Sequence, residues 1–321
     1  MEPILHEAIE ASKVLCLDQL GNPGLVVGAA MARSKSSSGF KDKLGIVSLT
    51  SRIQGFGNWM EQLIAESTGK IGRGVLPVVL DGNSPELNNV ADDVLIIGLV
   101  DDVTDHSFDV KVSGGLGAQL LLWEVATVVA AKLLGVNPFD QPDVESAKVA
   151  SRAFLENKAP AQNPLFTDSG IEVSAKNLDL NAGSNLADAF KLLLATANDH
   201  SYFAIHAYLD RGRDDAFEKL RDLIAQVSSR PTTFGWGPRF LHSTGQYHKG
   251  GPAQGVFLQL IGSEDQELAV PGRDFGFMEL MNSQAAGDAN VLAAAGRPVV
   301  TLRFKDKTKA LGLIQTILEA K

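Results

Sequence analysis

Apolar runs alternate with helical patterns along the first half of the chain. Two uninterrupted runs rich in β-branched residues, at 75–80 and 94–100, are typical of strands buried on both faces of a sheet. A shorter apolar run at 44–50 predicts a third strand. Residues 52–67 carry apolar side chains on one helix face, namely Ile53, Phe56, Met60, Leu63 and Ile64. Further helices are predicted at 3–19, at 24–34, at about 115–135, and from Asp140, a favourable N-cap. This alternation predicts a parallel sheet with helices on both faces.

The second half of the chain repeats the alternation. The predicted strands are 201–208, 231–235, 255–261 and 298–304, and the predicted helices are 186–197, 213–228, about 274–287 and 306–319. Between the halves, residues 156–185 are rich in turn-forming residues and contain one candidate strand, at 171–175. We therefore expect an α/β protein with open, mostly parallel sheets flanked by helices. Its predicted parts are a first α/β domain at 1–157, a linker at 158–185 and a C-terminal α/β domain at 186–321.

The charge balance argues against a nucleic-acid partner. The chain has 29 basic and 38 acidic residues, a formal charge of −9, and the stretch from Asp81 to Val110 has eight acidic residues and no Lys or Arg. Such a surface repels a phosphate backbone. An anionic substrate would need locally placed hydrogen-bond donors.

Cysteine content and hydropathy favour a cytoplasmic protein without a membrane partner. Cys16 is the only cysteine, so no intramolecular disulfide forms. The first fifteen residues carry acids where a signal peptide carries basic residues. The most apolar stretch, Leu120 to Val136, is interrupted by Glu124 and Lys132, which favours a buried helix over a membrane span.

Three segments carry residue types suited to chemistry, and the first is the Glu-Ser-Thr-Gly-Lys sequence at 66–70. Glu66 is predicted to lie in the last turn of a helix that ends at Gly69. The negative helix end and the indole of Trp59, seven residues earlier, would raise the pKa of Glu66 toward that of a general base working near neutrality. Alternatively, Glu66 is a surface residue paired with Lys70.

The second segment, at 137–148, is a loop that leads into a helix. Free N–H groups at a helix N-terminus suit an anionic or hydroxylated ligand. Gln141 and Lys148 are seven residues apart and project from one helix face. The alternative is a capped helix in which Asp143 and Glu145 satisfy the dipole and Lys148 lies in solvent.

The third segment, at 234–252, contains five glycines and two histidines in nineteen residues, too polar and irregular for ordinary core packing. Loops of this kind often carry function, and a histidine can transfer protons near neutral pH. A metal site is disfavoured because His242 and His248 are six residues apart with no supporting cysteine. A purely structural role is the alternative.

Other signatures are incomplete. Gly69-Lys70 lacks the remainder of a phosphate-binding P-loop, and the glycine pattern at 115–120 ends in Leu120 rather than Gly. A nicotinamide-dependent dehydrogenase is therefore disfavoured, and we expect neither a cofactor nor a metal.

Together the three segments resemble the glucose-6-phosphate isomerase family. The sequence ESTGK at 66–70 resembles the motif Glu-Ser-x-Gly-Lys, and NPFDQPDVESAK at 137–148 resembles Phe-Asp-Gln-x-Gly-Val-Glu-x-x-Lys. LHSTGQY at 241–247 resembles Leu-His-Ser-x-Gly-Gln-Tyr of bacterial members. The chain looks most like the isomerase half of fused transaldolase/glucose-6-phosphate isomerases, over roughly Asn22 to Phe304, and the likeness implies a sugar-isomerase-type α/β domain.

The resemblance implies that the chain interconverts glucose 6-phosphate and fructose 6-phosphate through a cis-enediol, with a hexose phosphate as its ligand. Glu66 would move the proton between C1 and C2, while His242 and Lys148 would assist ring opening. The implied substrate-binding residue is Gln141, and we add Arg239 and Gln246 as further candidates.

The chain also departs from the family pattern. Position 143 is Asp where the signature has Gly, and His242 follows Lys148, the order of the fused enzymes. The Gly-Gly-Arg-Phe-Ser/Thr motif and the Ser/Thr-rich phosphate loop are missing. We therefore expect a preceding isomerase or transaldolase portion, or a second copy of the chain, to complete the site. The alternative is a non-catalytic sugar-phosphate-binding module of the same fold.

Overall fold

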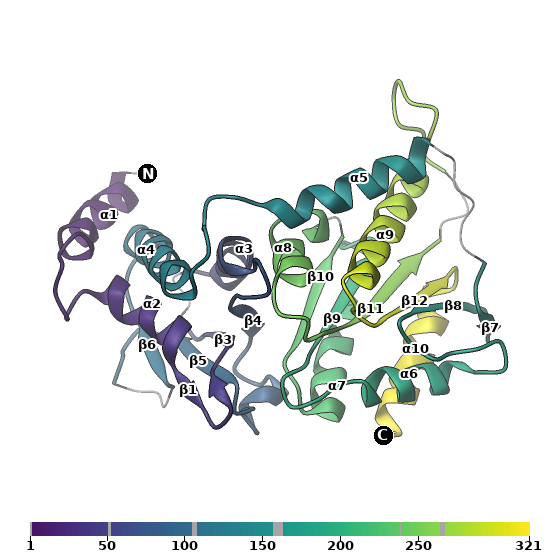
Figure 1. Ribbon diagram of the computed structural model, residues 1–321, viewed down its shortest axis with the longest axis horizontal. Helices are drawn as coiled ribbons and strands as arrows, with labels where there is room; N and C mark the ends of the chain where they lie inside the picture. The colour runs from purple at the N-terminus through teal and green to yellow at the C-terminus, as the bar shows by residue number, and fades with distance from the viewer. Residues whose placement is uncertain (1, 51–52, 105–107, 157–162, 238, 264–266) are drawn as a thin grey trace. The chain divides into compact units, whose positions relative to one another are not determined.

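The computed structural model describes residues 2–50, 53–104, 108–156, 163–237, 239–263 and 267–321. The chain divides into two compact units (Figure 1). Unit 1 comprises Met1–Gln141 with Gly250–Pro252, and unit 2 comprises Pro142–Lys249 with Ala253–Lys321.

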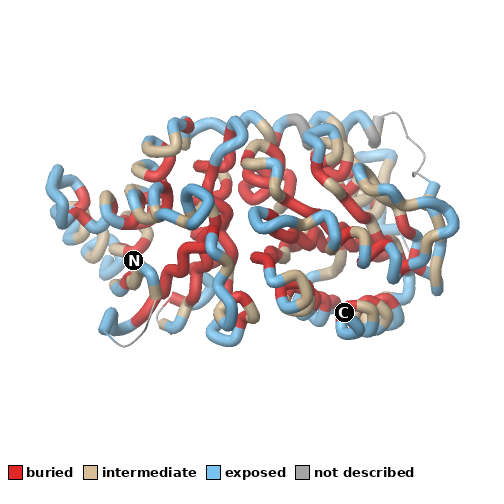
Figure 2. The backbone as a smooth tube through the Cα atoms, turned by 60° about the horizontal axis from the view of Figure 1, so that its bottom comes forward, coloured by how far each residue is buried: buried red, intermediate tan, exposed pale blue. Residues whose placement is uncertain are grey.

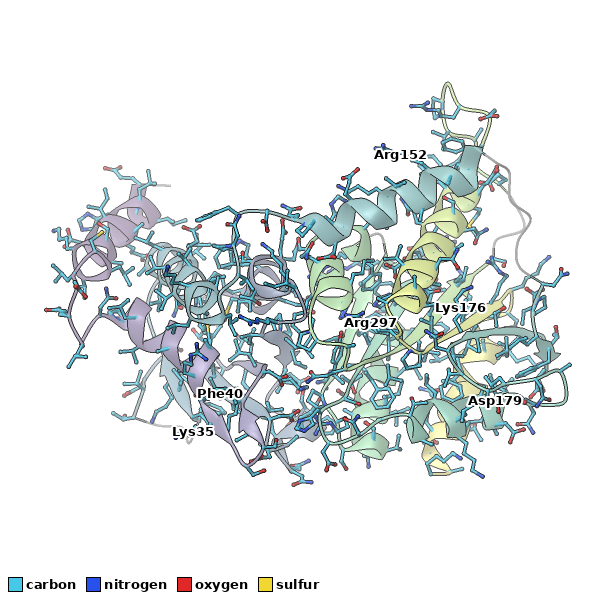
Figure 3. The ribbon with its side chains drawn as sticks, viewed as in Figure 1. Lys35, Phe40, Arg152, Lys176, Asp179 and Arg297 are labelled. Atoms are coloured by element: carbon cyan, nitrogen blue, oxygen red, sulfur yellow. The ribbon has the colours of Figure 1, made fainter. Side chains whose placement is uncertain are left out.

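Unit 1 is built on a four-stranded parallel sheet in the order β4-β3-β5-β6. Its strands are β3 (Lys43–Ser48), β4 (Leu76–Leu80), β5 (Val94–Leu99) and β6 (Val110–Val112). The helices are α1 (Glu2–Leu15), α2 (Pro23–Arg33), α3 (Phe56–Thr68), α4 (Leu116–Leu134) and the short η1 (Pro85–Leu87). A small hairpin joins β1 (Lys35–Ser36) to β2 (Gly39–Phe40), and Figure 3 labels its paired ends, Lys35 and Phe40.

The core of unit 1 forms where α4 packs on its neighbours. Trp123 is fully buried on α4, and its indole N–H donates to Gln119 at 2.9 Å. Met31 of α2 and Ile97 of β5 belong to the same buried cluster. Among the described residues, α4 is the one helix long and apolar enough to cross a membrane, but its buried positions pack in this core.

Unit 2 is built on a six-stranded sheet in the order β10-β9-β11-β12-β8-β7. The four strands β9 (Tyr202–Tyr208), β10 (Thr232–Trp236), β11 (Gly255–Gly262) and β12 (Val299–Phe304) are parallel. The edge hairpin of β7 (Phe166–Asp168) and β8 (Ile171–Lys176) adds antiparallel to β12. The helices are α5 (Pro142–Glu156), α6 (Leu186–Ala195), α7 (Lys219–Ser228), α8 (Ser243–Gly250), α9 (Phe277–Ala294) and α10 (Lys307–Glu319), with short helices η2 (Asp215–Glu218) and η3 (Arg239–Leu241).

The two faces of the unit 2 sheet differ in chemistry. Strand side chains alternate between faces, so Ile205 and Leu258 enter a large apolar core with α6, α7 and α10. Their neighbours His206 and Gln259 point to the opposite face, where α8 and α9 lie (Figure 1). The strands β9 and β11 are buried along their whole length, and Figure 2 draws much of the interior of each unit in red. Polar groups on the α8–α9 face are therefore enclosed.

The predicted fold class is confirmed, because both main sheets are mostly parallel and flanked by helices. The observed division differs from the predicted domains at 1–157 and 186–321. Helix α5 belongs to unit 2, and the predicted linker at 158–185 contains β7 and β8. Residues 157–162 of that linker lie outside the described chain. The linker differs because β8 pairs with β12, more than a hundred residues later, which a local pattern does not reveal. Helix α5 differs because it packs on α9, where the hydroxyls of Ser151 and Ser283 lie 3.2 Å apart.

Candidate functional site

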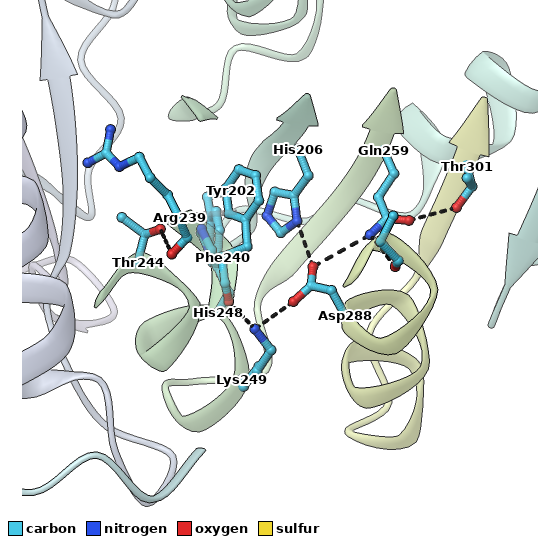
Figure 4. A network of polar contacts seen from close by, with 11 residues as sticks. Tyr202, His206, Arg239, Phe240, Thr244, His248, Lys249, Gln259, Asp288 and Thr301 are labelled. Carbon is cyan, nitrogen blue, oxygen red and sulfur yellow. Dashed lines mark hydrogen bonds and ion pairs between the residues drawn. The ribbon is translucent and has the colours of Figure 1, made fainter. Parts of the chain in front are cut away.

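A row of polar side chains crosses three neighbouring strands of the unit 2 sheet. Gln259 of β11 is in register with His206 of β9 on one side and with Thr301 of β12 on the other. The Thr301 hydroxyl donates to the Gln259 carbonyl oxygen at 3.0 Å, and the Gln259 amide donates to the backbone oxygen of Ala285 at 3.1 Å. Figure 4 shows the three side chains on adjacent strands, with Gln259 between His206 and Thr301. Since buried amides need partners, the row fixes the Gln259 side chain.

Asp288 of α9 lies at the centre of this network and is fully buried. One carboxylate oxygen lies 2.9 Å from His206 Nδ1, and the other lies 2.6 Å from Lys249 Nζ (Figure 4). Burial by itself raises the pKa of Asp288, but the Lys249 charge and the His206 hydrogen bond outweigh it and hold the pKa well below its ordinary value. Asp288 and Lys249 therefore form a buried ion pair.

The His206 imidazole is enclosed on one side by Phe240. The two rings stack with centroids 3.6 Å apart and planes inclined by 8°. Gly235 of β10 lies opposite His206 in the sheet, and a Cβ at that position would lie 2.7 Å from the Phe240 ring. The glycine thus leaves room for the stack. Burial lowers the pKa of His206, although Asp288 opposes this, so the ring is neutral at physiological pH.

A second buried histidine lies on α8. His248 Nδ1 is 2.9 Å from the Tyr202 hydroxyl, and burial, together with nearby cationic groups, lowers the pKa of His248 well below its ordinary value. The neutral ring fills space among aromatic neighbours, including Phe257. His248 therefore serves the packing of this face, in agreement with the structural alternative for part of the third segment.

The turn before α8 carries two predicted site residues, Arg239 and His242. The His242 N–H donates to the Arg239 carbonyl at 3.0 Å, and the Thr244 hydroxyl lies 3.4 Å from the same oxygen. Lys249 Nζ donates to the next carbonyl, that of Phe240, at 2.6 Å. Arg239 is half-buried, whereas His242 is exposed. The turn is thus anchored from beneath and presents the imidazole to solvent.

The second and third segments are bonded to each other within unit 2. Gln246 of α8 is fully buried; its side-chain oxygen accepts from the Asp143 N–H at 3.0 Å, and its amide donates to the Asp143 carboxylate at 2.7 Å. Contact of Gln246 with a substrate, as predicted, would require these bonds to break. The geometry gives Gln246 the role of joining α8 to the first turn of α5.

Lys148 lies on α5, five residues after Asp143. Its ammonium group is 3.6 Å from Glu145, and its side chain is one-third exposed. It is therefore held loosely by one surface carboxylate and can reach a ligand in solvent.

The first and second segments are bonded within unit 1. Lys70 is almost fully buried, and its ammonium group donates to the Asn137 carbonyl at 2.5 Å and lies 3.1 Å from the Asp140 carboxylate. Lys70 thus binds the 137–140 loop. The alternative from the sequence had instead paired Lys70 with Glu66. Glu66 lies half-buried in the last turn of α3, as predicted.

The six predicted site residues divide between the units. Glu66 and the exposed Gln141 belong to unit 1, and the other four, Lys148, Arg239, His242 and Gln246, belong to unit 2. That Glu66, Lys148 and His242 line a common cleft stays a prediction.

Sequence reasoning missed the buried network of His206, Lys249, Gln259 and Asp288. A signal was present, because each of the residues His206 and Gln259 is a single polar residue inside an apolar strand run. A lone polar side chain in such a run must find a partner in the interior. In the part of the chain that the structure describes, no group of three or more His, Cys, Asp or Glu residues is arranged to hold a metal.

Comparison with known proteins finds remote structural likenesses. No family model and no curated protein sequence matches the chain. A hypothetical protein from Thermus thermophilus has a similar structure over 99% of this chain and 88% of its own, with a TM-score of 0.36 and 12% identity. The C-terminal domain of glucosamine-fructose-6-phosphate aminotransferase from Francisella tularensis covers 91% of this chain and 94% of its own, with a TM-score of 0.29 and 10% identity. At these scores the likenesses assign no function.

Proposed function

We propose that this chain acts on a hexose phosphate as an aldose–ketose isomerase and interconverts glucose 6-phosphate and fructose 6-phosphate. One observation carries the proposal. The segment at 137–148 is bonded to the first segment through Lys70 and Asp140 in unit 1, and to the third through Asp143 and Gln246 in unit 2. The resemblance to one enzyme family rests on these three segments, which are distant in sequence. Polar contacts join the second segment to the first within unit 1 and to the third within unit 2.

The proposed chemistry needs three proton-transfer groups. Opening of the pyranose requires an acid–base pair at O5 and O1, which we assign to His242 and Lys148. Both are accessible on unit 2. Glu66 then removes the proton from C2 and returns it to C1, which passes the sugar through a cis-enediol.

Negative charge develops on the oxygens of the enediol and needs a fixed cation. We assign this role to Arg239, which lies three residues before His242 in the same anchored turn. Its guanidinium is permanently charged, and its planar donors suit sugar and phosphate oxygens. Gln141, exposed at the end of unit 1, is proposed to contact the sugar hydroxyls.

The test compares Glu66→Gln with Glu319→Gln. Both residues lie in the last turn of a helix, α3 and α10 respectively, so the second substitution controls for a changed helix-end charge. We expect the purified chain, in which a second copy can complete the site, to convert fructose 6-phosphate, Glu66→Gln to abolish turnover, and Glu319→Gln to preserve it. In D2O, proton return through a base predicts deuterium at C2 of glucose 6-phosphate, detectable by NMR.

Equal turnover in the wild type and Glu66→Gln contradicts the role of Glu66. Saturable binding of fructose 6-phosphate without turnover would instead support a non-catalytic binding module, which the missing phosphate loop favours. Absence of both binding and turnover would refute the proposal.

A further inference from the structure

The side chain of Lys249 connects the interior of unit 2 to the turn that carries His242. We infer that Lys249 and Asp288 are positioning residues: their buried ion pair fixes the 239–242 turn and thereby the orientation of His242. The effect of this ion pair on catalysis rests on the proposed function, whereas its effect on the rigidity of the turn does not.

The ion pair of Lys249 and Asp288, here called the anchor, is held in place by the sheet. Asp288 is held by His206 at 2.9 Å, and the Gln259 amide lies 3.5 Å from the same carboxylate oxygen. Both partners project from central strands, where the backbone has little freedom. The opposite carboxylate oxygen lies 2.6 Å from Lys249 Nζ, so the ammonium group takes its position from the strands. Charged hydrogen bonds in a buried setting are short and directional.

From this anchor Lys249 donates to the Phe240 carbonyl at 2.6 Å, inside the turn. The Phe240 ring is fixed as well, by its stack on His206. One residue of the turn is therefore bound through its backbone and its side chain to the same network.

The close packing of α8 beneath the turn completes the arrangement. Gly245 faces the turn, and a Cβ there would lie 1.7 Å from the Phe240 oxygen and 2.8 Å from Lys249 Nζ. Only a residue without a Cβ lets the carbonyl approach the ammonium group. If a side chain at position 245 pushed the turn away, His242 would move with the turn, because its N–H is bonded to the Arg239 carbonyl.

Two substitutions weaken the anchor by different routes. Lys249→Met removes the ammonium group, while Gly245→Ala changes no polar group and forces the turn away by contact alone. Gly312→Ala is the matched glycine control, since a Cβ there meets nothing within 4 Å on α10. Leu220→Ala, in the core on the opposite sheet face, controls for a general loss of stability.

The readout is the His242 imidazole signal in an NMR spectrum of the six histidines, assigned by its loss in His242→Gln. We expect Lys249→Met and Gly245→Ala to shift and broaden this signal, and Gly312→Ala and Leu220→Ala to leave it unchanged. An unchanged signal in either folded anchor variant overturns the inference. In the wild type, backbone order parameters near 0.85 are expected for 239–242, and values below about 0.6 would refute it without any variant.

Kinetics separate this inference from the proposed function. With glucose 6-phosphate as substrate, misplacement of His242 is expected to lower kcat by about 10-fold to 100-fold with little change in KM. If the wild type shows no turnover but the NMR signal responds as expected, the proposed function fails and the positioning role stands. If turnover is present and both anchor variants keep the wild-type kcat, the positioning role fails alone.

Discussion

At the residue scale, the buried network depends on two histidines being neutral. Burial lowers the pKa of both His206 and His248 below the ordinary value. Below about pH 6.5 histidines of the unfolded chain bind protons, whereas the two buried histidines of the folded chain stay neutral to lower pH. The free energy of unfolding is therefore unaffected by these groups above that pH and decreases as the pH falls below it. Asp288, whose pKa is also lowered, adds its own loss only below about pH 4.

We predict that the free energy of unfolding decreases from pH 6.5 to pH 5, by up to about 1.4 kcal/mol per pH unit for each buried histidine. His248→Gln should flatten this dependence, because one of the two groups no longer titrates. His200→Gln, at an exposed position, should leave it unchanged. Urea unfolding at several pH values measures the slope; equal slopes in His248→Gln and the wild type would contradict the prediction.

Sequence reasoning can locate side chains whose position is set by local signals, but not those whose position is set by packing. Glu66 was placed correctly at the end of a helix, because its helical pattern and Gly69 are local signals. The contact of Lys249 with Asp288 joins residues 39 positions apart on α8 and α9. No local spacing encodes such a contact, since it depends on how both helices pack on the sheet.

At the scale of elements, two asparagines that begin helices differ in burial. Asn22 is buried, and its side-chain oxygen accepts from the N–H of Gly24 at 2.9 Å. Its side-chain NH2 group donates to the backbone carbonyls of Leu15 and Leu17, near the end of α1. Asn185 is exposed and forms a capping box with Asp188 at the start of α6. Asn22 therefore joins two helices, whereas Asn185 caps one.

We predict that Asn185→Ala costs about 1 kcal/mol of unfolding free energy, the ordinary value of a cap. Asn22→Ala should cost about 2–3 kcal/mol, because it also leaves the buried Leu15 carbonyl without the Asn22 donor. Urea unfolding followed by circular dichroism compares them. A smaller loss for Asn22→Ala than for Asn185→Ala would contradict this assignment.

The link between α5 and α8 gives the Asp143 side chain a structural role. A glycine there has no carboxylate to bind Gln246, whereas Asp143 accepts from it at 2.7 Å. We predict that Asp143→Ala lowers the unfolding free energy by about 1–2 kcal/mol. Asp143→Asn keeps an acceptor and should cost less than about 0.5 kcal/mol. Thermal melts measure the difference, and equal losses in both variants would argue against the link.

The strands were predicted well, and the hairpin of β7 and β8 less so. The runs at 94–100 and 255–261 match β5 and β11 to within one residue at each end, because buried parallel strands have a clear composition. The hairpin at 166–176 lies in a stretch rich in turn residues, and its place in the sheet depends on β12. Element type was therefore readable locally, and element partnership was not.

At the scale of the whole molecule, the two units have separate apolar cores. Ile97 belongs to the cluster in unit 1, and Leu220 to the large cluster in unit 2. Each core is assembled by its own sheet and helices, so each unit can unfold as a cooperative body.

We predict two calorimetric transitions that respond to different substitutions. Ile97→Ala should destabilise one by about 2–5 kcal/mol, and Leu220→Ala should destabilise the other by a similar amount. The two variants are matched, since both remove buried methyl groups from fully enclosed positions. A single transition shifted equally by both would show one cooperative unit and contradict the prediction.

The return of Gly250–Pro252 to unit 1, inside the chain of unit 2, bears on where the gene can be divided. The Gly250 carbonyl accepts from the Gly72 N–H at 2.8 Å, so this short return completes a backbone hydrogen bond of unit 1. A fragment that ends at residue 141 would lack that acceptor, and a fragment that begins at residue 142 would carry it away from its donor.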